Sequence, residues 1–212
     1  MKRIVFGFFA IILLNACSDT ESNSTPLPDA NFYALTLGNS WVYKNYKYDP
    51  GSETYQDTGV IDSVSVVGLE DISGVKYFKM RRMTIGNEAG ITFCNPNGEH
   101  FEYVRDDNGN LTTIDGHVKF SHTDASLRTI AAYEWGTIVE QLMEGTTELS
   151  VTSGVFDCMK SERYAILSNG DIAPGVDSFY YADGYGLIYD TSSTVTNEIP
   201  SIIRYLDSYN VQ

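Results

Sequence analysis

The chain has 212 residues, of which 28 are acidic and 14 are basic, so its formal net charge is −14. This charge argues against a nucleic-acid-binding protein, which needs a basic surface, and against electrostatic binding to anionic lipid headgroups. With 42% hydrophobic and 13% aromatic residues, the chain is too apolar to be disordered throughout, and its length suits one domain with a real core.

A secretion signal opens the chain. Lys2 and Arg3 form its basic start, and an uninterrupted apolar run follows over residues 4–14. At about 1.5 Å rise per residue, this run covers roughly half of a hydrocarbon core. It is therefore too short to span a membrane as a helix, and no later segment is apolar enough to do so.

The signal ends in Leu14-Asn15-Ala16-Cys17, which resembles the lipobox of bacterial lipoproteins. The resemblance implies that residues 1–16 are a signal peptide cleaved between Ala16 and Cys17. It also implies that diacylglycerol is attached to the Cys17 sulfur and that the new amino group is acylated, by palmitate for example. The lipid would then be the protein's link to the membrane. The alternative is an ordinary signal peptide with a cysteine near its end.

Residues 17–30 are polar and contain two prolines, so they predict a flexible tether. Asp19 and Glu21 resemble the surface-export signals of Bacteroidota lipoproteins, and a merely solvated linker is the alternative. We therefore expect an exported protein, anchored by lipid to the outer membrane, on its periplasmic or cell-surface side. The leaflet stays open.

Residues 31–212 predict a single β domain. Turn dipeptides such as Asn108-Gly109 and Ser153-Gly154 punctuate runs rich in Val, Ile, Thr, Tyr and Phe. We expect strands over residues 41–48, 59–67, 75–84, 99–105, 147–152, 155–167, 177–182, 186–190 and 201–206. This pattern predicts an all-β, antiparallel sandwich, roll or half-barrel of about 9–12 strands, with at most one or two short helices. The predicted helix covers residues 124–133, where Leu127, Ile130 and Ala131 have helical spacing.

Two further motifs carry a second resemblance. Residues 35–43 read Leu-x-x-Gly-x-x-Trp-x-Tyr, and residues 180–187 read Tyr-Tyr-Ala-x-Gly-x-Gly-Leu. Together with Gly154-Val155-Phe156, these motifs resemble an uncharacterised family of Bacteroidota envelope lipoproteins. The resemblance implies a lipoprotein with a curved β-sheet domain and no established activity, and it transfers no catalytic residue.

Cys94 and Cys158 are the two cysteines that lipidation leaves. Export permits a disulfide between them, and two thiols that pack as small hydrophobic side chains are the alternative.

Several short segments suggest chemistry but are better explained as structure. Asp57-Thr58-Gly59 has no second copy to complete an aspartic protease, and residues 106–110 fit a hairpin turn better than a calcium loop. The three histidines lack zinc spacing and are expected at the surface: His100, His117 and His122. We therefore expect no metal and no cofactor.

Tyrosines gather towards the two ends of the chain: Tyr43, Tyr46, Tyr48, Tyr180, Tyr181, Tyr185 and Tyr189. They are expected to pack on half-buried β surfaces, with an exposed binding face as the alternative. The favoured function is a non-enzymatic binding or structural module whose ligand or protein partner is unknown. The alternatives are a carrier of lipid or another apolar ligand in a half-barrel trough, and a secreted hydrolase that uses carboxylates.

Overall fold

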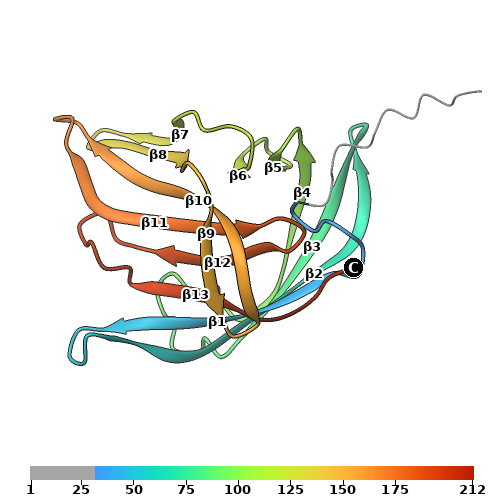
Figure 1. Ribbon diagram of the computed structural model, residues 1–212, viewed down its shortest axis with the longest axis horizontal. Coiled ribbons are helices and arrows are strands. Elements are labelled where there is room, and N and C mark those ends of the chain that lie inside the picture. The colour runs from blue at the N-terminus through green and yellow to red at the C-terminus, as the bar shows by residue number, and fades with distance from the viewer. Residues whose placement is uncertain (1–31) are drawn as a thin grey trace, which may run out of the picture.

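The computed structural model describes residues 32–212, which form one antiparallel sheet of thirteen strands and contain no helix (Figure 1). No helix in this range could therefore cross a membrane. The signal peptide, the Ala16–Cys17 cleavage site and the tether lie outside the described residues. The strands are β1 Ser40–Asp49, β2 Thr54–Ile72, β3 Val75–Ile85, β4 Gly98–Asp107, β5 Asn110–Thr113, β6 Val118–Ser121, β7 Arg128–Tyr133, β8 Gly136–Leu142, β9 Thr147–Val151, β10 Gly154–Leu167, β11 Ile172–Ala182, β12 Gly186–Ser192 and β13 Ile202–Asn210.

The sheet is open and strongly curved. Its strand order is β6-β5-β4-β3-β2-β1-β13-β12-β11-β10-β8-β7, and β9 pairs with β10 beside this path. Register shifts between Lys44 and Tyr46 in β1 and between Val66 and Gly68 in β2 mark bulges, which bend strands and increase their twist. The predicted all-β antiparallel class is confirmed, and the curved open sheet corresponds to the half-barrel alternative (Figure 1).

Short local signals form turns and bulges in this sheet. Asn108 and Gly109 connect β4 to β5 with φ angles of 54° and 87°, as a two-residue hairpin turn requires. The Asp106 carboxylate accepts a hydrogen bond from the Gly109 amide at 2.8 Å, so this run is a hairpin turn. The Asp57 carboxylate likewise accepts from the Gly59 amide at 2.8 Å within the bulged part of β2.

The helix predicted over residues 124–133 is wrong. Residues 128–133 form strand β7, which pairs with β8, and Arg128 lies opposite Glu140. The Arg128 guanidinium donates to the Glu140 carboxylate at 2.6 Å. Leu127, the first residue of the supposed apolar stripe, is exposed. The backbone ladder and this ion pair therefore outweigh the local helical spacing, since tertiary context overrides weak propensity.

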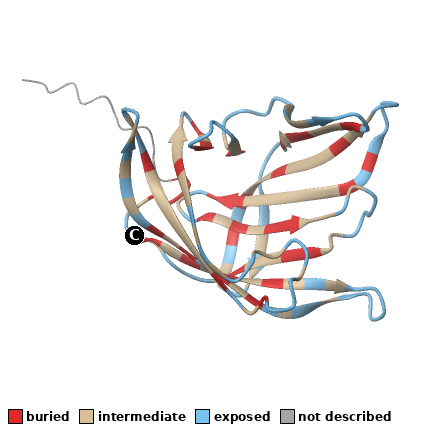
Figure 2. Cartoon of the chain, turned by 180° about the vertical axis from the view of Figure 1, so that it is seen from behind, coloured by how far each residue is buried: buried red, intermediate tan, exposed pale blue. Residues whose placement is uncertain are grey.

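A short segment ahead of β1 packs into the concave side of the sheet. Residues 32–35 are buried there, and the Tyr33 hydroxyl donates to the carbonyl oxygen of Gly109 at 2.6 Å. Phe120 of β6 stacks on Tyr181 of β11 with ring centroids 4.2 Å apart. Buried positions recur along the strands while the hairpin tips are exposed (Figure 2). The N-terminal segment and the Phe120–Tyr181 contact thus connect the β6 edge of the sheet to β11.

The two cysteines of the domain are free thiols in the structure. Cys94 is partly buried in the loop between β3 and β4, and Cys158 is fully buried in β10. Cys158 packs in the core cluster that also contains Val64, Phe156 and Ile188. Its environment is that of a small hydrophobic side chain.

Four tyrosines form a cross-strand ladder over β11, β12, β13 and β1. Tyr180 and Tyr189 are paired in register, as are Tyr189 and Tyr205, and their ring centroids lie 5.4 and 4.8 Å apart. Tyr46 continues the row with a centroid 5.8 Å from that of Tyr205. All four are of intermediate exposure, so these tyrosines pack on one another as expected of a half-buried sheet surface.

Candidate ligand-binding site

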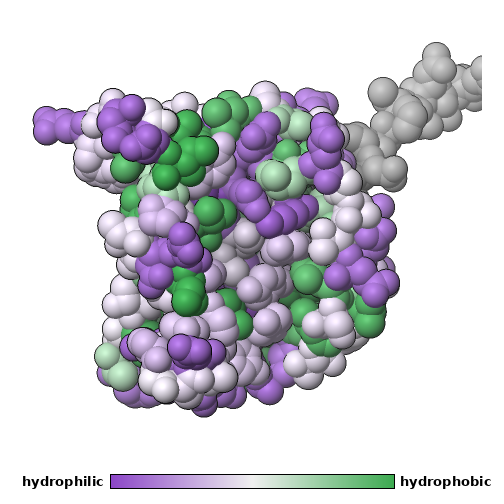
Figure 3. Space-filling view, turned by 60° about the vertical axis from the view of Figure 1, so that its left-hand side comes forward, coloured by the Kyte–Doolittle hydropathy of each residue, from purple (hydrophilic) through white to green (hydrophobic). Residues whose placement is uncertain are grey.

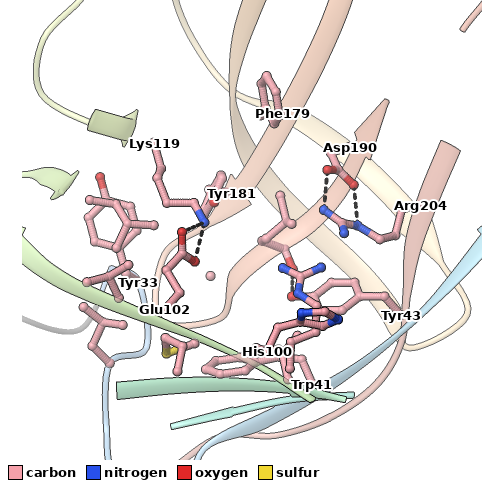
Figure 4. Close-up of a pocket in the computed structure, with 18 of the residues that line it drawn as sticks. Tyr33, Trp41, Tyr43, His100, Glu102, Lys119, Phe179, Tyr181, Asp190 and Arg204 are labelled. Atoms are coloured by element: carbon pink, nitrogen blue, oxygen red, sulfur yellow. Dashed lines mark hydrogen bonds and ion pairs between the residues drawn. The ribbon is translucent and has the colours of Figure 1, made fainter. Parts of the chain in front are cut away.

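A cavity of about 530 Å³ lies in the concave side of the sheet. Its wall comes from the N-terminal segment and from most of the strands, so residues far apart in sequence meet there (Figure 4). Its apolar and aromatic lining consists of Tyr33, Leu35, Trp41, Tyr43, Val64, Met80, Phe101, Val104, Leu111, Phe179, Tyr181, Gly186 and Leu187. Its polar lining consists of Arg82, Asn95, His100, Glu102, His117, Lys119, Arg163, Asp190 and Arg204.

Four neighbouring strands contribute one row of this lining. Trp41 of β1 lies opposite Val64 of β2, Val64 lies opposite Arg82 of β3, and Arg82 lies opposite His100 of β4. All four residues line the cavity. Because side chains directly opposite in an antiparallel sheet are neighbours on one face, the row places an aromatic ring, an aliphatic side chain, a guanidinium and an imidazole side by side.

Arg204 and Asp190 form an ion pair beside this row. Nε and Nη2 of Arg204 donate to the two carboxylate oxygens of Asp190 at 2.8 and 2.5 Å (Figure 4). Burial works against the charge of Arg204, but Asp190 and Asp62 more than offset it, so the pKa of Arg204 is raised. The hydroxyl of the adjacent Tyr43 donates to the Leu187 carbonyl at 2.9 Å, and burial raises the pKa of this tyrosine.

Asp62 stands behind the cavity wall and is fully buried. Its carboxylate accepts hydrogen bonds from the Thr84 hydroxyl at 2.6 Å and from the side-chain amides of Asn45 and Asn95, both at 3.1 Å. Burial works against the carboxylate, but the Thr84 hydrogen bond and the charges of Arg82 and Arg204 outweigh it, so the pKa of Asp62 is lowered. Asp62 is thus a satisfied, charged group.

The other charged side chains of the wall are paired. The Lys119 ammonium donates to both oxygens of Glu102, at 2.7 and 2.5 Å, and burial lowers the pKa of this lysine while Glu102 opposes the shift (Figure 4). Arg163 donates from two nitrogens to Glu140, at 3.0 and 2.7 Å. Both acids of the lining, Glu102 and Asp190, are therefore engaged by cations.

Arg82 differs from the other cations of the lining. Its guanidinium makes no hydrogen bond with any residue of 32–212 that the structure describes, and its nearest acid is the Asp62 carboxylate at 3.8 Å. Burial and the charge of Arg204 lower the pKa of Arg82. A second cavity, of about 220 Å³, shares Arg82, Asn95, Asp190 and Arg204 with the first, so this guanidinium lies where the two cavities meet.

The lining differs in charge from the chain as a whole. Four cationic side chains and two acidic ones line the cavity, namely Arg82, Lys119, Arg163 and Arg204 with Glu102 and Asp190. The chain as a whole carries twice as many acidic as basic residues. Cations are therefore concentrated in the concave face of an otherwise anionic protein.

The histidines lie at different places. His100 and His117 line the cavity, whereas His122 stacks on Phe32 with ring centroids 4.1 Å apart. Within residues 32–212, no group of three or more His, Cys, Asp or Glu side chains is arranged to hold a metal ion. The lipidation residue Cys17 lies outside the described residues, so the site predicted there stays a prediction.

Comparisons with known proteins extend the description of the fold. No protein-family model matches the sequence, and no curated protein matches it. A solved structure from Bacteroides fragilis NCTC 9343 matches with a TM-score of 0.54 and 12% identity. The match covers 85% of this chain and 99% of that chain, which is described as an inferred exported protein with a YmcC-like fold. An inferred lipoprotein from Parabacteroides distasonis ATCC 8503 matches with a TM-score of 0.51 and 13% identity over the same shares.

The fold of this chain is similar to that YmcC-like fold. At these identities the likeness extends to the fold alone. The residues of the cavity are therefore interpreted from their own geometry.

Proposed function

We propose that this protein is a lipid-anchored binding protein of the bacterial envelope, and that the cavity in its concave face holds a small ligand. The observation that carries the binding role is the open cavity of about 530 Å³, which combines an aromatic wall with a guanidinium that makes no hydrogen bond to any described residue. Cavities that bind small molecules are commonly about 300–1,000 Å³, with an apolar lining and a few polar groups that fix orientation.

The chemistry of the lining favours binding over hydrolysis. A carboxylate-dependent hydrolase needs acidic groups free to act as base, acid or nucleophile. Glu102 and Asp190 are instead held by Lys119 and Arg204. Arg82 also makes the cavity a poor match for a wholly apolar ligand, because an apolar body would take water from a guanidinium that makes no hydrogen bond to residues 32–212.

Small molecules that remain with the purified protein test the binding role. The protein is isolated from membranes, freed of loose solutes by gel filtration and denatured, and the released molecules are identified by mass spectrometry. We expect one compound at close to one molecule per chain. The binding role is contradicted if the protein releases no molecule and candidate ligands added to it also fail to bind in the cavity.

The sequence resemblance at Cys17 and the inferred lipoprotein with the same fold support lipid anchoring. Replacing Cys17 with Ser removes the sulfur that would carry diacylglycerol. We expect the variant to leave the membrane fraction and to enter the aqueous phase on detergent phase separation. A variant that remains with the membranes would show that another element of the protein holds it there.

A further inference from the structure

Arg82 has unused capacity to bind a ligand. A guanidinium carries five N–H donors, and those of Arg82 make no hydrogen bond with residues 32–212 as described. The Asp62 carboxylate is too distant for a hydrogen bond at 3.8 Å, and it already accepts from Thr84, Asn45 and Asn95. Because Asp62 is satisfied by these groups, it leaves the Arg82 donors available.

The remaining cations of the cavity are not available in the same way. Arg204 holds Asp190 with two hydrogen bonds, Arg163 holds Glu140 with two, and Lys119 holds Glu102. A ligand would have to break one of these pairs to use its cation. Among the four, Arg82 can bind an anionic ligand without breaking a hydrogen bond, because its contact with Asp62 at 3.8 Å is ionic only.

The surroundings of Arg82 favour a singly charged, planar anion. A guanidinium matches a carboxylate through two parallel hydrogen bonds. Two acids lie nearby: the Asp62 carboxylate is 3.8 Å from Arg82, and Asp190 lines both cavities that Arg82 lines. They would repel a second negative charge, so a carboxylate fits better than a phosphate ester, which carries about −1.5 to −2 at neutral pH.

The same row supplies an apolar contact for the rest of the ligand. Val64 lies directly opposite Arg82, Trp41 lies beyond Val64, and Met80 precedes Arg82 by two residues on the same face. Hydrophobic side chains on the surface drawn in Figure 3 fall in several separate groups, interspersed with hydrophilic ones. In the cavity, an apolar lining and the Arg82 guanidinium lie side by side.

We propose that Arg82 receives the carboxylate of the ligand, and that the cavity takes a monocarboxylic acid with an apolar body. This inference rests on the proposed binding function and names the ligand class of that same site.

Tryptophan fluorescence provides a reporter inside the cavity. The chain has two tryptophans: Trp41 lines the cavity, whereas Trp135 is exposed in the turn between β7 and β8. In a W135F background, emission therefore reports on the cavity. In a W41F background, the emission comes from Trp135, which lies outside the cavity, so this variant serves as the control.

Three probes with the same alkyl chain are titrated into the W135F protein: octanoate, octanamide and octyl phosphate. We expect octanoate to change the Trp41 emission and to bind at least tenfold more tightly than octanamide and than octyl phosphate. An R82Q substitution should weaken the binding of octanoate at least tenfold and change the affinity for octanamide less than twofold. R82K keeps the charge without the planar fork and should give an intermediate loss.

R81Q is the matched control, because Arg81 is the neighbouring residue on β3 but does not line the cavity and pairs with Glu99 at 2.5 Å. Its octanoate affinity should stay within twofold. Equal binding of octanoate and octanamide would overturn the role of Arg82 while leaving the binding function standing. Tighter binding of octyl phosphate would overturn the carboxylate assignment. No response of Trp41 to any probe would overturn the ligand class, and the released-molecule measurement would then decide the binding function separately.

Discussion

Asp190 of β12 and Arg204 of β13 lie opposite each other in register and form a two-bonded ion pair in the cavity wall. The pair engages Arg204. Of the four cations that line the cavity, Arg82 is then the one without a hydrogen bond to residues 32–212. Arg204 is thus held by two hydrogen bonds, whereas Arg82 has only the ionic contact with Asp62 at 3.8 Å among residues 32–212.

Asp190→Ala should destabilise the fold. The substitution leaves Arg204 largely buried without its main counterion, and breaking a buried pair in this way costs about 3–5 kcal/mol. Denaturant unfolding measures the change. Glu99→Ala, which breaks the exposed pair with Arg81, should cost less than about 1 kcal/mol. Equal losses in the two variants would mean that the Asp190–Arg204 pair is effectively solvated.

Asp62 should make stability depend on pH in the acid range. Its folded-state pKa is lowered from the ordinary value of 3.8, so its carboxylate stabilises the fold at neutral pH. That contribution is present above the ordinary pKa and is lost as the pH falls through the lowered one. The free-energy difference of unfolding between wild type and Asp62→Asn should therefore shrink between pH 7 and pH 3. A constant difference across this range would argue against the charged, hydrogen-bonded carboxylate.

Tyr33→Ala should remove an anchor of the N-terminal segment. Tyr33 is buried, and its hydroxyl reaches the carbonyl oxygens of Gly109 and Phe120. Truncating a buried aromatic side chain costs about 3–5 kcal/mol, whereas Tyr133→Ala at an exposed position should cost about 1 kcal/mol or less. Thermal unfolding of the two variants gives the comparison. Similar stabilities would show that the segment contributes little to the core.

Cys94 and Cys158 should react differently with iodoacetamide. Burial, together with Asp157, raises the pKa of the Cys158 thiol to about 12, so little thiolate is present at pH 8. Cys94 is only partly buried, although burial also raises its pKa. In a Cys17→Ser protein, we expect mass spectrometry to find Cys94 modified under native conditions and both thiols modified after unfolding. An unfolded, unreduced protein that takes up no label would reveal a disulfide between them.

Local sequence signals predicted much of the sheet because each acts over a few residues. Asn108-Gly109 predicted a hairpin turn from the positive φ that glycine and asparagine tolerate, and the structure has that turn. Residues 128–133 show where such signals fail. The spacing of Leu127, Ile130 and Ala131 fits a helix, but pairing with β8 and the Arg128–Glu140 contact decide the conformation.

The candidate site could not be predicted from the sequence because its parts meet only through strand register. Trp41, Val64, Arg82 and His100 belong to four different strands, and nearby bulges in β1 and β2 shift which residues face each other. His100 was expected merely at the surface, yet it lines the cavity. No alternation marks Arg82 in the sequence, because Arg81 stands beside it and residues 75–85 do not alternate between apolar and polar side chains.

A crystal structure of the protein with octanoate would show the ligand and its contacts. We expect electron density for the alkyl chain in the concave cavity, with the carboxylate within about 3 Å of the Arg82 guanidinium nitrogens. An empty cavity at saturating octanoate, or a carboxylate that lies away from Arg82, would contradict this expectation.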